Sequence, residues 1–353
     1  MGILDRYIAR AVLGGSLAVL LIIVSMELIF AFVDESADVD DQYTAFNALL
    51  YVVLGAPQRA YEAFPIATLI GSLMTLGGMA ARHELVVMRA AGVSMLGIAR
   101  PVMLAGLLLA AVAAAIGEFI APPAERAALD VEAQARGGEV SMLSRAGFWV
   151  RDGRRFIRVG SATTAEHLRD LRIHVFTEDR RLEAVITAEQ ANYRGGGWRL
   201  EGVERTAITP DGVSVEQRAE ASLEGGLRPE VLDVVVVDPE TLSLQALHTY
   251  IGYLDDNELE SERYRLAFWL KVATPIATMA MLLLTLPLAF GALRSAGAGQ
   301  RIFIGVMIGI AFHLANRLLG HIGLVYGIPA AVSALLPAAL CLIAALVLLR
   351  RIR

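Results

Sequence analysis

The chain has 353 residues and a formal net charge of −5, and 56% of its residues are apolar. Its mean hydropathy of +0.56 is too high for a single soluble domain of this length. The composition therefore excludes an ordinary soluble protein and indicates a chain that is solvated mainly by a membrane. The single cysteine, Cys341, lies in an apolar stretch, so the polar middle of the chain contains no disulfide.

Six stretches are long and apolar enough to cross a bilayer, which requires roughly 20 residues in a helix. The first is too long for a signal-peptide core and lacks a cleavage site, so we expect an uncleaved anchor. An even number of spans puts both termini on one side of the membrane. The stretches are Ala11 to Val33, Ala60 to Ala81, Ile98 to Ala121, Leu266 to Phe290, Ile302 to Ile322 and Ala330 to Leu349.

Arginines occupy alternate loops between these spans, and such a bias sets membrane orientation. The opposite short loops are acidic or uncharged. We therefore expect both termini to be cytoplasmic and the polar middle to lie outside the cytoplasm. The arginines are Arg6, Arg10, Arg82, Arg89, Arg100, Arg294, Arg301, Arg350, Arg351 and Arg353.

The polar middle has the alternating pattern of short β-strands. Phe148 to Val159 reads as two runs joined at Asp152-Gly153, which is typical of a tight hairpin. The expected fold is six transmembrane helices with an antiparallel sandwich or jelly roll between the third and fourth, divided as 1–121, 122–260 and 261–353. Further strands are Leu171 to Thr177, Leu182 to Tyr193, Trp198 to Ile208, Val213 to Leu223 and Val231 to Val237, with turns that include 195–197 and 210–212.

The loop between the second and third spans predicts a short amphipathic helix over 82–92. Leu85 and Met88 share one face of such a helix, Arg82, Glu84 and Arg89 stay polar, and a glycine ends it. The pattern fits a helix that docks into a groove on a partner and, equally, a helix that lies on the lipid surface.

Six blocks of sequence, in this order, resemble one family. The chain is similar to the lipopolysaccharide export permeases of the LptF/LptG family, specifically the LptG type, over nearly its whole length. The blocks are Leu4 to Ile8, Glu84 to Gly92, Gly117 to Pro122, Asp238 to Ser243, Leu247 to Ile251 and Leu324 to Pro329.

The resemblance implies a permease subunit of an ABC exporter in the inner membrane of a Gram-negative cell. Such a subunit forms a heterodimer with an LptF-type permease and is driven by a dimer of the LptB-type ATPase. It takes lipopolysaccharide from the outer leaflet of the inner membrane, and its periplasmic jelly roll passes the lipid to LptC-type and LptA-type bridge proteins. We expect no cofactor, metal site, catalytic residue or nucleic-acid partner.

The residues agree that ATP hydrolysis belongs to a partner. A P-loop needs a lysine after a glycine-rich turn, and the only lysine, Lys271, lies in an apolar run. The resemblance makes the helix at 82–92 the coupling helix that contacts the ATPase. Glu84 is the expected polar contact, with Arg82, Leu85, Met88 and Arg89 around it.

A multi-acylated anionic lipid needs an apolar cavity and cations near the headgroups. His313, Asn316, Arg317 and His321 fall on one face of the fifth span, where an arginine at membrane depth suggests function. The alternative is that Arg317 reaches the lipid headgroups or pairs with Glu27 or Glu118. The resemblance adds cavity-lining positions, namely Met26, Phe30, Phe64 and Phe312.

One departure from the family concerns the first span, whose outer end often carries a lysine in such permeases. This chain has Ala31 there. The anionic headgroup is then bound by Arg317, by the partner permease or by bridging divalent cations. Gly305 and Gly309 form a GxxxG pair in the fifth span, a weak motif that suits the seam between subunits.

Three other readings remain open. A lipoprotein-releasing ABC permease also has an outer domain, but that domain follows the first span rather than the third. A membrane enzyme would need a paired nucleophile and base or a metal cluster, and the six histidines show no such spacing. A passive scaffold predicts that changes in the cytoplasmic loops leave function intact.

Overall fold

The computed structural model divides into two compact units. The first comprises Met1–Asp38, Leu49–Ala128 and Glu262–Arg353, and the second Val39–Ala48 and Leu129–Ser261. The strand expected at 231–237, parts of the turns near 195 and 210, Arg294 and Arg353 lie outside the described residues. The structure describes residues 2–40, 43–135, 148–164, 167–177, 179, 181–194, 197–209, 212–223, 238–291 and 296–351.

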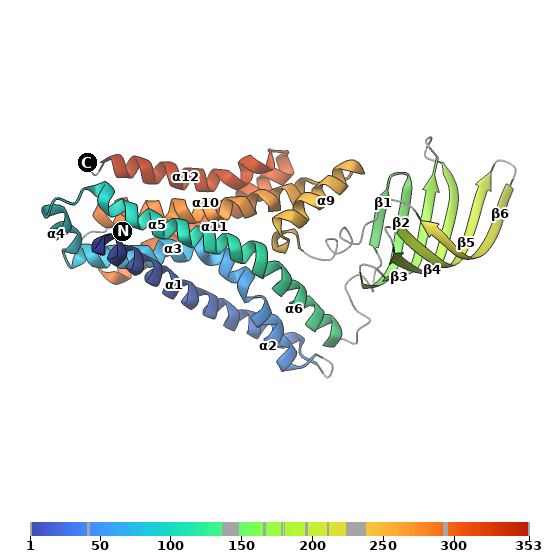
Figure 1. Cartoon of the computed structure of the whole chain (residues 1–353), viewed down its shortest axis with the longest axis horizontal. Helices are drawn as coiled ribbons and strands as arrows, with labels where there is room; N and C mark the ends of the chain where they lie inside the picture. Colours follow the sequence, from blue (N-terminus) through green and yellow to red (C-terminus); the bar gives the residue numbers. More distant parts are fainter. Residues whose placement is uncertain are drawn as a thin grey trace. The chain divides into compact units, whose positions relative to one another are not determined.

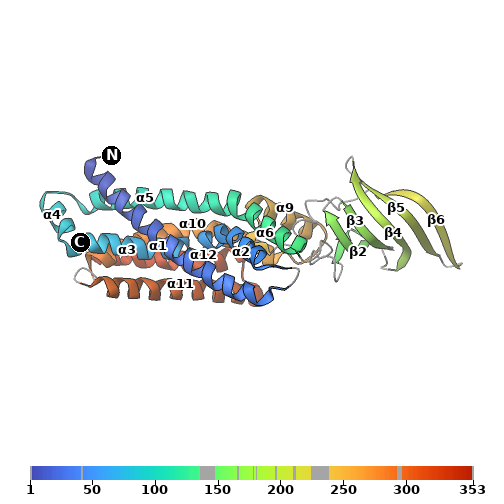
Figure 2. The same ribbon diagram turned by 90° about the horizontal axis from the view of Figure 1, so that it is seen from below.

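Six helices of the first unit are long and apolar enough to cross a membrane, which confirms the six predicted spans. They run side by side in both views (Figures 1 and 2). The start of α1 and the end of α12 lie at the same end of this unit (Figure 1). The helices are α1 (Ile3–Glu35), α3 (Ala56–Ala81), α5 (Met95–Ala115), α10 (Glu262–Phe290), α11 (Ala298–Tyr326) and α12 (Ala330–Arg351).

Two of these helices form the centre of the unit and two lie at its edge. In their most apolar segments, 78% of the residues of α3 and 61% of those of α10 are buried, against 11% in both α1 and α11. Apolar side chains on α1 and α11 therefore face outward, toward lipid or another subunit.

The backbones of α1 and α3 meet at Gly15 and Gly71. A methyl group added at Gly71 would lie 2.5 Å from the carbonyl oxygen of Gly15, and one added at Gly15 would collide with the side chain of Thr75. Small residues allow such close approach between membrane helices, where no hydrophobic drive brings the helices together. This contact fixes where α1 crosses α3.

The GxxxG pair of α11 is used within the chain, so its suggested use in the subunit seam is wrong. Added methyl groups at Gly305 and Gly309 would lie 3.1 Å from Ile70 and 2.9 Å from Ile66, both on α3. The motif seats α11 on the central helix because only glycine leaves room for these branched side chains.

The helix of the third spanning segment does not end at residue 121, where the predicted apolar stretch ends. It continues from α5 through a π-helical turn, η2 (Ile116–Ile120), into α6 (Ala121–Ala135). Pro122 and Pro123 lie in the first turn of α6, where a missing N–H costs little, and the π turn absorbs the change in hydrogen bonding. The helical segment therefore extends into the second unit, and the three-part division of the chain stays a prediction.

Several short elements had no prediction from the sequence. They are α2 (Ala45–Leu54), α9 (Leu244–Asp256) and the 3₁₀ turns η1 (Ser36–Asp38) and η3 (Pro239–Thr241). The 3₁₀ turns have too few residues to display a periodic pattern, whereas α9 has buried Leu247, Tyr250 and Leu254 at helical spacing, a signal that was available in the sequence.

The second unit contains a six-stranded antiparallel sheet, which confirms the predicted β domain. Its strands pair in chain order, so among the described strands each connection is a hairpin and the sheet is a meander (Figure 1). One face carries the apolar core of the unit. The strands are β1 (Phe148–Asp152), β2 (Arg155–Thr164), β3 (His167–Phe176), β4 (Leu182–Arg194), β5 (Gly197–Thr209) and β6 (Gly212–Leu223).

The first hairpin forms as predicted and is held by α9. Gly153 takes the left-handed conformation at the turn, with φ of 57°. Its N–H donates to Asn257 Oδ1 at 2.9 Å, and the Tyr253 hydroxyl donates to the carbonyl of Arg151 at 2.6 Å. Burial and the nearby Asp152 carboxylate raise the pKa of Tyr253 to about 12, so the hydroxyl keeps its proton at neutral pH.

A crease crosses the sheet from β2 to β6. The pairing between neighbouring strands is interrupted at one row of residues that are aligned across the sheet. The register of each strand pair is the same before and after this row. In a regular strand, side chains on one face are two residues apart, but across this row the inward side chains are three residues apart, as with Leu168 and Leu171. Each strand therefore keeps its apolar residues on one face while it bends. The row is Gly160, Asp170, Glu189, Gly202 and Ala219.

A groove of about 850 Å³ follows the crease and includes all five residues of the row in its lining. Two of these residues have left-handed backbone, Asp170 with φ of 52° and Gly202 with φ of 63°. Asp is one of the residues that tolerate this conformation. At Gly202 an added side chain would, in addition, have to displace that of Glu189. An added methyl group there would lie 2.9 Å from Glu189.

The Gly15 contact predicts different outcomes for two adjacent glycines. Gly15→Leu would force α1 away from α3 and lower the unfolding free energy by about 1–3 kcal/mol, the usual cost of overpacking. Gly14→Leu is the matched control, since nothing lies within 4 Å of the added atom. Thermal unfolding of the purified protein in detergent measures both, and equal midpoints would contradict the close crossing.

The crease yields a second pair of variants. Gly202→Ala places a side chain on left-handed backbone and should destabilise the β unit by about 1–2 kcal/mol. Gly197→Ala, at the start of the same strand, is the control, because its added atom would meet only the Leu223 carbonyl at 3.9 Å. Protection of the sheet amides against hydrogen exchange reports the difference, and similar protection in both variants would argue against a strained crease.

Candidate functional site

The predicted amphipathic helix is present as α4 (Glu84–Ala90) and is shorter than the segment 82–92. Arg82 still belongs to the end of α3, because His83 adopts left-handed backbone with φ of 62° and separates the two helices. Gly92, with φ of 89°, follows α4. Figure 1 shows α4 at the end of the helical unit where α1 starts and α12 ends.

The apolar face of α4 packs onto the chain's own helices. Leu85 is 1% exposed and lies in a cluster with Ile8 and Val12 of α1 and Met79 of α3, and Met88 packs against the same cluster. Leu85 is therefore covered neither by lipid nor by a partner. Of the residues expected to take part in coupling, Leu85 is the one that anchors α4 to the helices beneath it.

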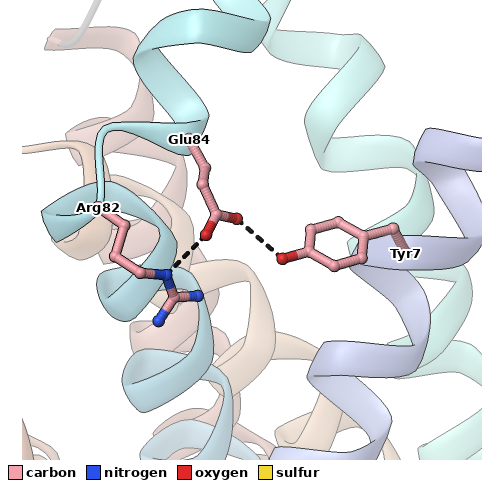
Figure 3. Close-up of polar contacts among 3 residues, drawn as sticks. All are labelled: Tyr7, Arg82 and Glu84. Atoms are coloured by element: carbon pink, nitrogen blue, oxygen red, sulfur yellow. Dashed lines mark hydrogen bonds and ion pairs between the residues drawn. The ribbon is translucent and has the colours of Figure 1, made fainter.

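Glu84 joins three helices through its carboxylate (Figure 3). Arg82 Nε donates to Glu84 Oε1 at 2.6 Å, and the Tyr7 hydroxyl of α1 donates to Glu84 Oε2 at 2.9 Å. The Arg82 hydrogen bond and, to a lesser degree, that of Tyr7 hold the pKa of the Glu84 carboxyl below its usual value. This arrangement is retained above the ordinary carboxyl pKa and is lost only as the pH falls through the lowered value.

The outer surface of α4 is exposed. Val87 is 65% exposed, Val86 is 39% exposed and Arg89 is exposed. The sequence singled out Arg89 and missed the two valines, because an apolar face was expected to point toward the partner. In the sequence, Val86 and Val87 are two apolar residues that lie off the face formed by Leu85 and Met88, and this pattern could have identified them.

Two of the expected cavity residues lie on the outward face of α1. Met26 is 52% exposed and Phe30 is 61% exposed, one turn apart on this edge helix. Their apolar surface is open to an acyl chain, to lipid or to another subunit.

Phe64 and Phe312 lie elsewhere, and the expectation that they line an open cavity does not fit this structure. Phe64 is 1% exposed within a cluster that includes Leu20, and Phe312 is 9% exposed against Leu69. Both side chains point into the helical unit because α3 and the inward face of α11 form its centre.

Arg317 is exposed on α11, and Asn316 beside it is partly buried. Within the described part of the chain no ion pair joins Arg317 to Glu27 or Glu118, so the alternative that an acid neutralises it finds no support. Its guanidinium is open to an anionic group outside the chain.

The sequence did not anticipate a polar contact inside the helical unit around Lys271. The Tyr61 hydroxyl of α3 donates to the Lys271 carbonyl of α10 at 2.9 Å. Its ring covers Gly117 of the π turn, where an added methyl group would lie 2.6 Å from it. Lys271 is 6% exposed and interacts electrostatically with Glu118. A lone lysine in an apolar run was the available signal.

The family model of the lipopolysaccharide export system permease LptF/LptG matches residues 6–351 of the chain. The chain belongs to this family. It is 35% identical to the LptG permease protein of Escherichia coli K12 over 99% of this chain and 98% of that protein. It is also 35% identical to LptG of Haemophilus influenzae over 96% of both chains. The match to Escherichia coli K12 LptF is 31% over 139 residues, or 38% of this chain and 37% of LptF.

Variants at two residues of α4 should distinguish the side chain that anchors the helix from one on its exposed face. Leu85→Ala leaves a cavity in the cluster below α4 and should cost about 2–5 kcal/mol of unfolding free energy. Val87→Ala, on the exposed face of the same helix, should leave thermal stability unchanged. Thermal unfolding of the purified chain compares the two variants, and equal stabilities would contradict the anchoring role.

Proposed function

We propose that this chain is the LptG-type permease subunit of the transporter that extracts lipopolysaccharide from the outer leaflet of the inner membrane. The extracted lipid passes through its β unit to LptC-type and LptA-type proteins. The observation that carries the proposal is the match to LptG proteins over nearly the full length of both chains. The β unit between the third and fourth spans argues against a lipoprotein-releasing permease, in which the outer domain follows the first span.

The proposed partner in the membrane is an LptF-type permease. The partial similarity to LptF is what two homologous halves of a heterodimer would have. The exposed apolar faces of α1 and α11 provide surfaces for the seam. These edge helices would enclose a cavity together with the partner, since Met26, Phe30 and Arg317 all face outward on them.

The chemistry of these residues fits a multi-acylated anionic lipid. Met26 and Phe30 offer apolar area, which is worth roughly 0.8 kcal/mol for each buried methylene of an acyl chain. Arg317 offers a cation that no acid of the described residues neutralises, and a guanidinium binds phosphate through two parallel hydrogen bonds. Asn316 adds a neutral polar group one residue away.

The proposed driving partner is a dimer of an LptB-type ATPase that contacts α4. Val87 and Arg89 on its exposed face, together with Glu84, form the contact surface, and Arg82, Leu85 and Met88 hold the helix in position. The sequence agrees, because its only lysine has no glycine-rich turn before it. A passive scaffold would have no use for this anchored cytoplasmic helix.

The proposed location is the inner membrane of a Gram-negative cell. The arginine bias puts both termini and α4 in the cytoplasm and the β unit in the periplasm. In this orientation, residues 1–121 and 261–353 form the membrane part and 122–260 form the periplasmic part. The apolar face of the sheet would then shield acyl chains on their way through water.

Extraction of lipopolysaccharide from proteoliposomes tests the proposal. Vesicles contain this chain, its two kinds of partner and the acceptor protein, and the released lipid is measured with and without ATP. Wild type should release lipid only with ATP. Glu84→Ala should abolish ATP-dependent release, and Arg317→Ala should reduce it by about tenfold while ATP hydrolysis continues, as expected for loss of a charge-assisted contact.

The matched controls are Glu260→Ala and Arg350→Ala, which remove exposed charges elsewhere. Both should behave as wild type. If wild type releases no lipopolysaccharide, the transport function is refuted. If wild type releases lipid and both test variants match it, the function stands and the roles of Glu84 and Arg317 are wrong.

A further inference from the structure

The two carboxylate oxygens of Glu84 are held by two different helices, which is unusual for a residue on the surface of a short helix. Arg82 at the end of α3 holds Oε1 at 2.6 Å, and Tyr7 in the first turns of α1 holds Oε2 at 2.9 Å (Figure 3). The contact with Tyr7 spans 77 residues of sequence. The carboxylate therefore connects α4 to the start of α1 as well as to α3.

An apolar contact lies beneath this polar one. Leu85 of α4 packs in one buried cluster with Ile8 and Val12 of α1, and Ile8 follows Tyr7 directly. Two consecutive residues of α1 thus take part in the packing of α4, Tyr7 through a hydrogen bond and Ile8 through the shared cluster. A displacement of α4 must move the start of α1 or break both contacts.

Farther along, α1 packs on α3 and α5 and then has a long exposed part. Its backbone meets α3 at Gly15 and Gly71, and beyond this crossing Met26 and Phe30 are more than half exposed. The helix has 33 residues and is about 50 Å long. At the glycine crossing the two backbones touch, so a tilt of α1 against α3 displaces α1 least at this point.

We propose that Tyr7 is a positioning residue of the transport cycle, which passes the displacement of α4 to α1. In this mechanism α1 pivots at the Gly15–Gly71 crossing. The face that carries Met26 and Phe30 then moves against the lipid. The inference rests on the proposed function, because the partner ATPase supplies the displacement.

Tyr7→Phe tests the link by removing one hydroxyl group. In the reconstituted transporter, the amount of lipopolysaccharide released per ATP hydrolysed should fall roughly threefold to tenfold, the effect expected for one hydrogen bond. ATP hydrolysis, thermal stability and copurification of the ATPase should match wild type. Tyr326→Phe is the control, since Tyr326 is 77% exposed at the far end of α11.

A double variant separates coupling from a structural role. If the hydroxyl acts through Glu84, a Glu84→Leu background, which has no acceptor for it, should show the same nucleotide-driven change in the position of α1 with and without Tyr7→Phe. An equal loss of this change in both backgrounds would overturn the link. Loss of ATPase copurification in Tyr7→Phe alone would also overturn it, because Tyr7 would then only preserve the shape of α4.

A distance measurement tests the movement without lipopolysaccharide. Spin labels at Val33→Cys and Val332→Cys, in a Cys341→Ala background, report on the exposed ends of α1 and α12. A non-hydrolysable ATP analogue should shift this distance in wild type and leave it nearly unchanged in Tyr7→Phe. A shift without lipid release in wild type would remove the proposed function and keep the inference, whereas equal shifts in both proteins, or none, would overturn the inference.

Discussion

The close approach of neighbouring helices to α3 is the constraint on which the helical unit depends. Lipid tails are as apolar as leucine, so packing rather than hydrophobic exclusion must hold the helices together. Glycine provides it at several crossings: Gly71 against α1, Gly305 and Gly309 against Ile70 and Ile66, and Gly117 beneath Tyr61. Even Arg301 of α11 fits this rule, because its side chain lies across Gly77, where an added methyl group would be 2.6 Å from it.

The position of α4 follows from this central helix. The chain turns at His83 directly after α3, so the short helix stays within reach of the end of α1. Leu85 fixes it by burial, and Glu84 fixes it by two hydrogen bonds at the surface. A partner that contacts α4 from outside therefore acts on a rigid arrangement, and the force can pass to α1, the least buried of the helices together with α11.

The β unit meets a different requirement. A sheet that keeps one apolar face and still curves must solve a conflict, because a bend normally disturbs the alternation of side chains. The crease solves this by inserting one residue in each strand at the same row, with left-handed backbone at Asp170 and Gly202. Apolar residues such as Leu168 and Leu171 thereby remain on one face on both sides of the bend.

The sequence by itself determined the six spans, the antiparallel sheet with its first hairpin, the short helix after the second span and the family. These depend on local composition and period, which act over neighbouring residues. It also named Glu84 and Arg317, since a charge beside or within an apolar segment stands out. The continuation of the third span past Pro122 was missed, because proline is tolerated in the first turn of a new helix and a π turn cannot be read from pattern.

The tertiary structure alone decided which face of each helix is covered. Phe64 and Phe30 are equally apolar in sequence, yet one is buried in the centre and the other is exposed on α1. The GxxxG pair and Leu85 were assigned to partners and are used within the chain, because the identity of a neighbouring helix depends on contacts distant in sequence. Tyr7 acquires its role in the same way: its contact with Glu84 exists only after α1 and α3 have packed at their glycines.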